Sequence, residues 1–192
     1  TIADLQSEAD SRLRLEIESV NTITQEIADL NVRISTSEGG GQVAADERDR
    51  RDALLEQLSE KIDVDTIELS DGSINVTLPT GLALVTGSVS RALETTTGPS
   101  FAGGSAPPSL DGGILNFVVF NYGTTAARAD VDLTSTLAQG NGVIGGLLRM
   151  RGVQDTADTS AFEADGFLPE LAAKVEAITR TLLTQFNQTY LG

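Results

Sequence analysis

The chain has 192 residues, of which 40% are hydrophobic and 4% aromatic, and its formal net charge is −15. This hydrophobic fraction argues against a disordered chain, and the scarcity of aromatic residues predicts an aliphatic core. The acidic balance argues against nucleic acid or an anionic membrane as a partner, because both bind basic surfaces. Cysteine and histidine are absent, which excludes disulfides, thiol chemistry and histidine-based catalytic or metal sites.

An apolar seam with helical spacing organises the first 34 residues. Its members recur at alternating steps of three and four, and only Gln6 and Glu16 interrupt the register. This spacing puts a narrow apolar stripe along a long helix, which therefore needs a partner helix. The helix-packing residues expected here are Leu13, Val20, Ile23, Ile27, Leu30 and Ile34.

Three glycines at 39–41 are expected to end this helix and let the chain reverse. A second helix is predicted over 45–63, because acidic residues lead its first turn and an apolar face follows. The packing residues of that face are Leu54, Leu58 and Ile62. The two helices together predict an antiparallel helical hairpin.

After the second helix the apolar period changes from about 3.6 to 2, which is typical of strands. Residues 71–72, Asp-Gly, are expected to form a two-residue hairpin loop. In that register Leu69 faces Ile74 and Ile67 faces Val76, so that the apolar residues share one face. Further strands are expected at 82–86, 88–94, 114–122 and 129–133, with 114–122 central because it is apolar on both faces.

The last third returns to a helical pattern. Residues 142–151 are predicted to form a helix that starts with glycines, and 152–166 a polar loop. A final helix is predicted to start near Pro169, which a first helical turn tolerates. Its apolar seam, expected to lie against the first helix, is formed by Leu171, Val175, Ile178, Leu182 and Phe186.

These elements predict an α+β fold, in which an elongated antiparallel, coiled-coil-like helical bundle carries a small inserted β subdomain that is mostly antiparallel. The helical domain is expected to be discontinuous, covering 1–64 and 142–192. The β subdomain is expected to cover 65–141, with a Gly/Pro-rich loop at 95–113. Because the chain begins and ends inside helical patterns, we expect it to be a central fragment of a longer protein.

No stretch of the chain has a pattern typical of a catalytic, phosphate-binding or metal-binding site. The glycines near 142 lack the lysine and the spacing of phosphate-binding loops, so a closely packed helix start is the preferred interpretation. The carboxylates are spread over helix faces, and no stretch has the oxygen spacing of a calcium loop. We therefore expect no catalytic residue, no cofactor and no metal ion. No apolar run reaches the roughly 18 residues of a membrane span.

Three segments, taken in chain order, resemble the hook-associated protein 1 family of the bacterial flagellum, whose members form the first hook–filament junction. Residues 20–34 resemble a family helix with an Ile-Ala-x-Leu-Asn core, 49–54 the pattern Asp-Gln-Arg-Asp-x-Leu, and 142–151 a glycine-rich helix start. The matching motif residues are Asp49, Arg51, Asp52, Gly145, Gly146, Leu147 and Leu148. Arg50 replaces the usual Gln, and Arg48 stands where the family often has Leu.

The resemblance implies a structural protein of the flagellum that the flagellar secretion apparatus exports and that is extracellular after export. It implies assembly with other copies of the chain, with the hook protein and with the second junction protein. An export chaperone is implied for a terminus outside this sequence. Enzyme activity is not implied, nor is binding to nucleic acid or a membrane.

Two alternatives stay open at this point. The second junction protein and flagellin also use long paired helices, although the Asp-Arg-Arg-Asp and Gly-Gly-Leu-Leu segments are not expected in them in this order. A secreted binding protein or adhesin that holds a ligand on its β subdomain belongs to a different class. A bound small molecule or glycan in a β-subdomain pocket would favour that second alternative.

Overall fold

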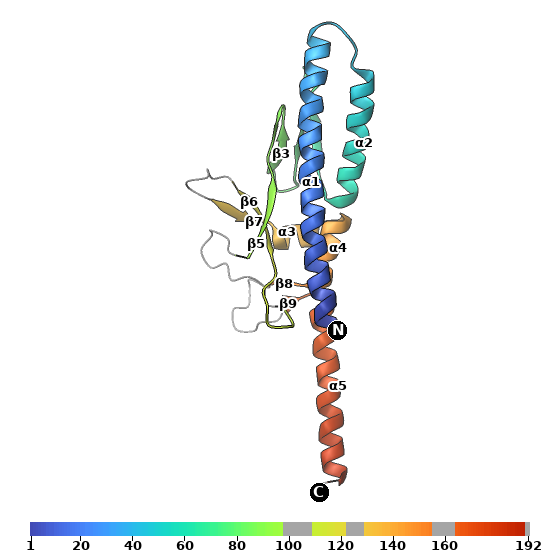
Figure 1. The fold of residues 1–192 in the computed structure, drawn as a ribbon, viewed down its shortest axis with the longest axis vertical. Coiled ribbons are helices and arrows are strands. Elements are labelled where there is room, and N and C mark those ends of the chain that lie inside the picture. The colour runs from blue at the N-terminus through green and yellow to red at the C-terminus, as the bar shows by residue number, and fades with distance from the viewer. Residues whose placement is uncertain (98–108, 122–128, 155–163, 191–192) are drawn as a thin grey trace.

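The computed structural model describes residues 1–97, 109–121, 129–154 and 164–190. Its frame is a long helix, α1 (Ile2–Gly39), paired with the antiparallel α2 (Ala45–Lys61) at one end (Figure 1). The 38 residues of α1 span about 57 Å at roughly 1.5 Å per residue. At the other end α5 (Phe167–Tyr190) continues the long axis past the N-terminus of α1.

Local sequence explains where α1 ends. In its first turn the Thr1 hydroxyl accepts a hydrogen bond from the Asp4 amide. At the other end, the Gly40 amide closes the last turn and Gly41 adopts a positive φ of 79°. That conformation suits glycine and lets the chain reverse into α2.

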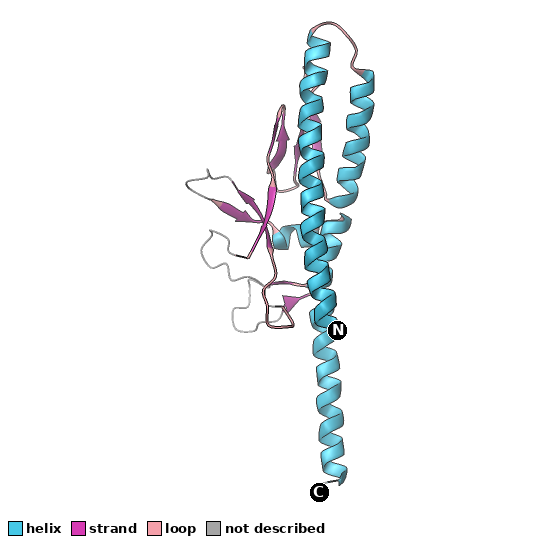
Figure 2. Ribbon diagram, in the orientation of Figure 1, coloured by secondary structure: helices cyan, strands magenta, loops and turns pink. Residues whose placement is uncertain are grey.

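The β region (residues 65–132) lies on one side of α1 and contains two antiparallel sheets (Figure 2). The first sheet has the order β1 (Asp65–Glu68), β2 (Ile74–Thr77), β3 (Ala83–Thr86) and β4 (Val89–Ser90). The second has the order β5 (Leu93–Thr96), β6 (Phe117–Asn121) and β7 (Asp130–Asp132). The strand predicted as central, β6, is the middle strand of this second sheet, and four of its residues are buried.

Three short elements and a helix connect the β region to α5. They are α3 (Thr134–Gln139), α4 (Gly142–Arg151), β8 (Val153–Gln154) and β9 (Ala164–Asp165). The helix α3 was not predicted, and the expected polar loop at 152–166 contains the β8–β9 pair. The expected loop at 95–113 begins inside β5, and its residues 98–108 lie outside the described part of the chain.

The predicted register of the first β-hairpin is wrong by one residue. Glu68 pairs with Ile74 and Ile67 with Asn75, so Ile67 is 60% exposed. The turn is longer than two residues, because the Leu69 amide donates to the Ser73 carbonyl oxygen across it. A one-residue change in register moves every side chain of a strand to the opposite face of the sheet.

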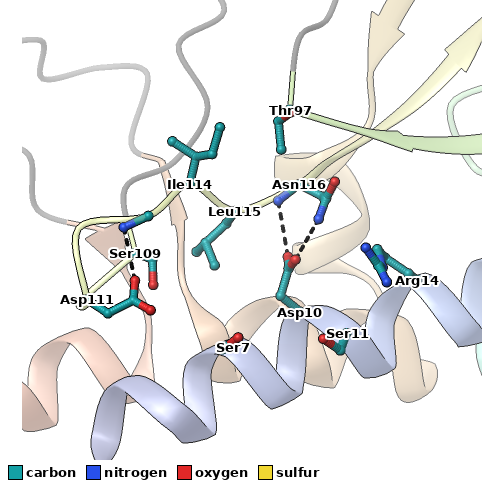
Figure 3. Close-up of a pocket in the computed structure, with 11 residues that line it drawn as sticks. Ser7, Asp10, Ser11, Arg14, Thr97, Ser109, Asp111, Ile114, Leu115 and Asn116 are labelled. Atoms are coloured by element: carbon teal, nitrogen blue, oxygen red, sulfur yellow. Dashed lines mark hydrogen bonds between the residues drawn. The ribbon is translucent and has the colours of Figure 1, made fainter.

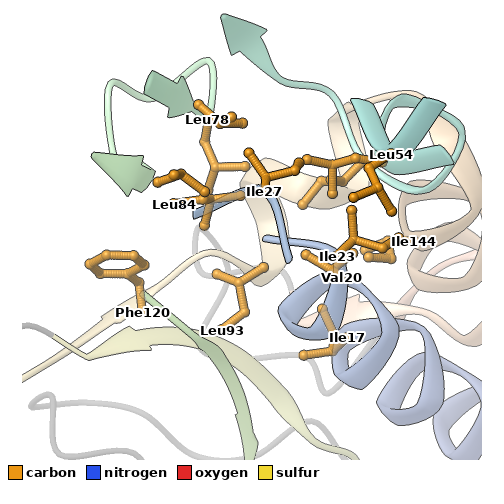
Figure 4. Close-up of a cluster of buried hydrophobic side chains, with 14 of the residues drawn as sticks. Ile17, Val20, Ile23, Ile27, Leu54, Leu78, Leu84, Leu93, Phe120 and Ile144 are labelled. Atoms are coloured by element: carbon orange, nitrogen blue, oxygen red, sulfur yellow. The ribbon is translucent and has the colours of Figure 1, made fainter. Parts of the chain in front are cut away.

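A single aliphatic core joins the helices to both sheets (Figure 4). Ile27 of α1, Leu84 of β3, Leu93 of β5 and Ile144 of α4 all belong to it and are at most 1% exposed. The helices α1 to α4 and the two sheets of the β region contribute apolar residues to it, which is how packed layers of secondary structure are stabilised. The predicted fold class, an α+β helical bundle with a small antiparallel β subdomain, is confirmed.

Candidate functional site

The apolar face shared by α1 and α2 is the first of the expected helix-packing surfaces. None of its expected residues is more than 8% exposed, and the two helices pack directly on each other. The structure therefore places this face in the interior of the chain. The buried residues are Leu13, Val20, Ile23, Ile27, Leu30, Ile34, Leu54, Leu58 and Ile62.

The seam of α5 lies on the surface, and the expectation that it packs along the first helix is wrong. Within α5 only Leu168 and Pro169 are buried. The reason is geometric: α5 meets α4 and the start of α1, then runs on beyond Thr1 where no other described element lies beside it (Figure 1). The exposed fractions are 36% for Leu171, 48% for Val175, 61% for Ile178, 61% for Leu182 and 58% for Phe186.

We call these five residues, Leu171, Val175, Ile178, Leu182 and Phe186, the α5 stripe. Charged pairs occupy other faces of the same helix: Lys174 lies 3.7 Å from Glu170, and Arg180 pairs with Glu176 on the face away from the stripe. At the far end of the stripe the ring centroids of Phe186 and Tyr190 are 4.6 Å apart. An apolar stripe on a helix whose other faces are polar is typical of a helix that packs on another helix.

The motif residues of α2 have unequal environments. Asp49 and Asp52 are exposed, whereas Arg51 is only 3% exposed. Its Nη1 donates to the Gly72 carbonyl oxygen at 2.7 Å and to Asn31 Oδ1 at 3.3 Å. Burial lowers the pKa of Arg51, and the nearby Arg48 charge lowers it further. Arg51 thus connects α2 to both α1 and the first hairpin.

Arg48, one of the two residues that depart from the family pattern, lies at the centre of a charged cluster with Glu38 and Glu68. Its guanidinium donates to Glu38 at 2.7 and 2.8 Å and to Glu68 at 2.6 Å. The bond from Arg48 lowers the pKa of Glu38, and the two carboxylates raise the pKa of Arg48. A Cβ at Gly72 would lie 2.8 Å from Arg48 Nη2 and closer still to Glu38 Oε2, so a larger residue there would displace these side chains.

The glycine-rich motif explains how α4 packs on α3. A Cβ at Gly145 would lie 2.9 Å from the Leu137 carbonyl oxygen and closer still to that of Gly140, whereas one at Gly146 would meet nothing within 4 Å. Leu148 is fully buried, and Leu147 packs against the core from a partly buried position. Gly145 therefore permits the backbone of α4 to approach the backbone of residues 137–140 closely.

A second buried arginine, Arg151, ends α4 and is 0% exposed. Its guanidinium pairs with Asp10 of α1 and donates to the Asn116 carbonyl oxygen. Asp10 also accepts from the Asn116 amide at 3.1 Å and from its side chain at 2.6 Å, while Gln6 donates to the Arg151 carbonyl oxygen at 2.7 Å. Burial lowers the pKa of Arg151 to about 10.

Beside this cluster lies a polar pocket of about 470 Å³ between α1 and the 109–116 segment (Figure 3). Asp10 at its wall already binds Asn116 and Arg151, and Asp111 accepts a bond from the Gly113 amide at 3.0 Å. That bond and one from Ser109 lower the pKa of Asp111. Both carboxylates therefore hold the 109–116 segment in place.

The described residues contain no group of three or more acidic, histidine or cysteine side chains that could hold a metal ion. Among the helices of those same ranges, none is long and apolar enough to cross a membrane. The features that stand out in the described part of the chain are packing faces and buried polar contacts.

Sequence reasoning missed the polar residues that join the β region to α1. One signal was present: both interruptions of the apolar register make long-range polar contacts. Gln6 binds the backbone of Arg151 and Leu110, and Glu16 pairs with Lys61 at 2.6 Å. Asn31 ends the Ile-Ala-x-Leu-Asn segment that resembles the family, but its partners could not be predicted from that segment, and Arg151 had no comparable signal.

Comparison with known proteins identifies the family. Flagellar hook-associated protein 1 of Escherichia coli is 29% identical over 94 residues, and that of Salmonella typhimurium is 30% identical over the same length. Each match covers 48% of this chain and 17% of the relative, so the chain spans only a small part of the curated relatives' length.

The fold itself is similar to a solved structure, the flagellar hook junction protein FlgK from Burkholderia pseudomallei. The TM-score is 0.59 at 24% identity, over 77% of this chain and 24% of that chain. A family model described as the flagellar hook-associated protein FlgK helical domain matches residues 1–190. Because this match covers nearly the whole chain, the chain belongs to the family of the flagellar hook-associated protein FlgK helical domain.

Proposed function

We propose that this chain is the helical-domain part of a structural protein of the bacterial flagellum, located at the hook–filament junction. Membership of the FlgK helical-domain family over residues 1–190 supports this function. The relatives are named as flagellar hook-associated protein 1 and as a flagellar hook junction protein. In this proposal the protein acts by packing of helix faces and carries no cofactor and no catalytic site.

The exposure of the α5 stripe is the single observation that supports packing of helix faces as the mode of action. Five large apolar side chains at helical spacing are 36–61% exposed, and in water such a continuous apolar surface is unfavourable. We assign this surface to a helix partner within the assembled junction. The candidate partners are other copies of the same protein, the hook protein and the second junction protein.

The domain division belongs to the same proposal. Residues 1–64 and 142–192 form the helical domain that makes subunit contacts, and 65–141 form a β subdomain that faces outward. The position of the β region on one side of α1 supports this arrangement (Figure 1). The motif residues Arg51 and Gly145 act inside the subunit, because both are engaged in internal contacts. Export by the flagellar secretion apparatus, aided by a chaperone, places the protein outside the cell.

A complementation experiment tests the proposal. In a normally motile bacterium whose own copy of the full-length gene has been deleted, the gene is returned carrying Ile178→Asp together with Leu182→Asp, which places two charges in the α5 stripe. We expect hooks without attached filaments in electron micrographs and loss of swimming, because a buried unpaired charge prevents helix packing. The matched control is Thr184→Asp, on the opposite face of the same exposed helix.

The control strain should build filaments and swim. Secreted amounts of both variants should equal the wild type, which separates assembly from export. Normal filaments in the strain with the doubly charged stripe would show that the α5 stripe is not an assembly surface. Normal hook–filament junctions in the strain that lacks the gene altogether would contradict the proposed function itself.

A further inference from the structure

The Asn31 side chain fastens the first sheet to α1. It is 1% exposed, and its Nδ2 donates to the carbonyl oxygens of Ile74 at 2.8 Å and Gly87 at 2.7 Å. Its Oδ1 accepts from the Ile74 amide at 3.1 Å. The Asn31 carboxamide therefore binds both backbone groups of Ile74 in β2, and it also binds Gly87 in the turn between β3 and β4.

This arrangement requires one orientation of the carboxamide. Arg51 Nη1 lies 3.3 Å from Asn31 Oδ1 and donates to it, while also donating to the Gly72 carbonyl oxygen at 2.7 Å. A guanidinium only donates hydrogen bonds, so a carboxamide turned by 180° would place its NH₂ group against another donor. Arg51 thus keeps the oxygen toward the Ile74 amide and the nitrogen toward the two carbonyl oxygens.

Stability does not explain why a charged residue occupies this position. Arg51 is 3% exposed, and its hydrogen-bond partners among the described residues are uncharged oxygens, while its Nε has no partner among them. Burying a cation without a carboxylate in contact is unfavourable, and an apolar residue of similar size is often as stable. The buried Arg151 differs, because it pairs with Asp10.

We propose that Arg51 is a positioning residue that orients the Asn31 carboxamide and thereby seats the four-stranded sheet on the helical hairpin, independently of the second sheet. The two sheets have separate polar attachments to α1. Asn31 holds the first sheet, whereas Asn21 binds both backbone groups of Leu93 at 2.8 Å and Asp10 holds the segment before β6. Loosening one attachment therefore leaves the other intact.

The test is Arg51→Met in the 192-residue chain, with hydrogen exchange followed by mass spectrometry. We expect exchange to accelerate about tenfold or more in peptides covering 72–77 and 84–90, because a local opening of the first sheet becomes accessible. Peptides covering 93–96 and 117–121 should exchange at the wild-type rate. The melting temperature should stay the same or rise. The matched control is Arg50→Met on the same helix, since Arg50 is 64% exposed and pairs only at the surface with Glu26.

Further variants separate positioning from a general loss of structure. Arg51→Lys keeps one donor and should restore part of the protection at 72–77. Asn31→Ala should accelerate the same peptides, and adding Arg51→Met to it should change them less than Arg51→Met does alone, because the Asn31–Arg51 contact is then already lost and only the Arg51–Gly72 bond remains to be removed. Arg151→Met should instead accelerate exchange at 93–96 and 117–121.

Three results would overturn the proposal. One is unfolding of Arg51→Met as judged by circular dichroism, since a positioning role leaves the helices folded. Another is equal acceleration in both sheets. The last is wild-type exchange at 72–77 in Arg51→Met, which would show that Asn31 keeps its orientation without the guanidinium.

Discussion

The apolar faces of α1 and α5 have nearly the same spacing and opposite environments. Ile27 on α1 is 0% exposed, whereas Ile178 on α5 is 61% exposed. α1 meets α2, α4 and the β region, while most of α5 extends beyond every other described element (Figure 1). Spacing alone therefore establishes that a helix has a face suited to packing, and the position of the helix in the fold decides whether the chain itself covers that face.

The largest expected difference comes from placing a charge on each face. Ile27→Asp should lower the free energy of unfolding by about 3–5 kcal/mol, because the carboxylate would be buried without a partner. Ile178→Asp should change it by no more than about 0.5 kcal/mol, as surface substitutions usually do. Urea denaturation followed by circular dichroism measures both values. Equal losses would mean that α5 is packed in solution.

Shortening a leucine to alanine on a buried and on an exposed helix face should give a similar but smaller difference in stability. Leu58→Ala removes a fully buried side chain of α2 and should cost about 2–5 kcal/mol, since it leaves a cavity in the core. Leu182→Ala, at a position 61% exposed, should stay within about 0.5 kcal/mol of the wild type. Thermal unfolding monitored by calorimetry tests both variants. A large loss for Leu182→Ala would contradict the exposed position of the stripe.

The neighbouring glycines of α4 sharpen the comparison within a single helical turn. Gly145→Ala should destabilise the chain by about 1–3 kcal/mol, because its Cβ would overlap the α3 backbone. Gly146→Ala has open space and should stabilise by about 0.5–1 kcal/mol through helix propensity. Denaturant titrations of the two variants should therefore shift in opposite directions. Shifts of the same sign would show that the α3–α4 contact is looser than described.

Acid pH should lower the stability of the α1–α2 end more than that of α5. We expect this effect to be the smallest of those predicted here. The pKa of Glu38 lies below its ordinary value of 4.5 because Arg48 binds the carboxylate. Its contribution to stability is therefore present above that value and is lost as the pH falls through the folded-state pKa. Glu38→Gln should lower the denaturation midpoint at neutral pH, and its effect should shrink as the pH falls through the folded-state pKa of Glu38.

The control for the pH series is Glu176→Gln on α5, whose exposed pair with Arg180 should matter little at either pH. A Glu38→Gln effect that persists unchanged in acid would mean that packing of the side chain, and not its charge, stabilises this end of the hairpin.

Helix periodicity and turn residues were the sequence features that predicted secondary structure most reliably. They predicted α1, α2, α4, α5 and the central strand β6 close to their observed bounds. The register of the β1–β2 hairpin could not be predicted in the same way. Asp71 Oδ1 accepts from the Ser73 amide and hydroxyl, and Gly72 adopts a φ of 79°, so the turn takes extra residues.

The buried polar contacts were the least predictable part of the candidate site. Arg151 meets Asp10 across 141 positions of the chain, and Asn31 meets Ile74 across 43. Asn31 and Gln6 bind backbone groups, which every residue carries, so no pairing of side-chain types in the sequence points to the contact.

The sequence by itself determined the aliphatic helices, the acidic surface and the absence of thiol and imidazole chemistry, because periodicity and composition are local properties. Only the tertiary structure decided that the opening seam is covered while the α5 stripe is exposed, and that two arginines are buried. The physical reason is that burial depends on which segments meet, and a repeating apolar spacing carries no information about its partner.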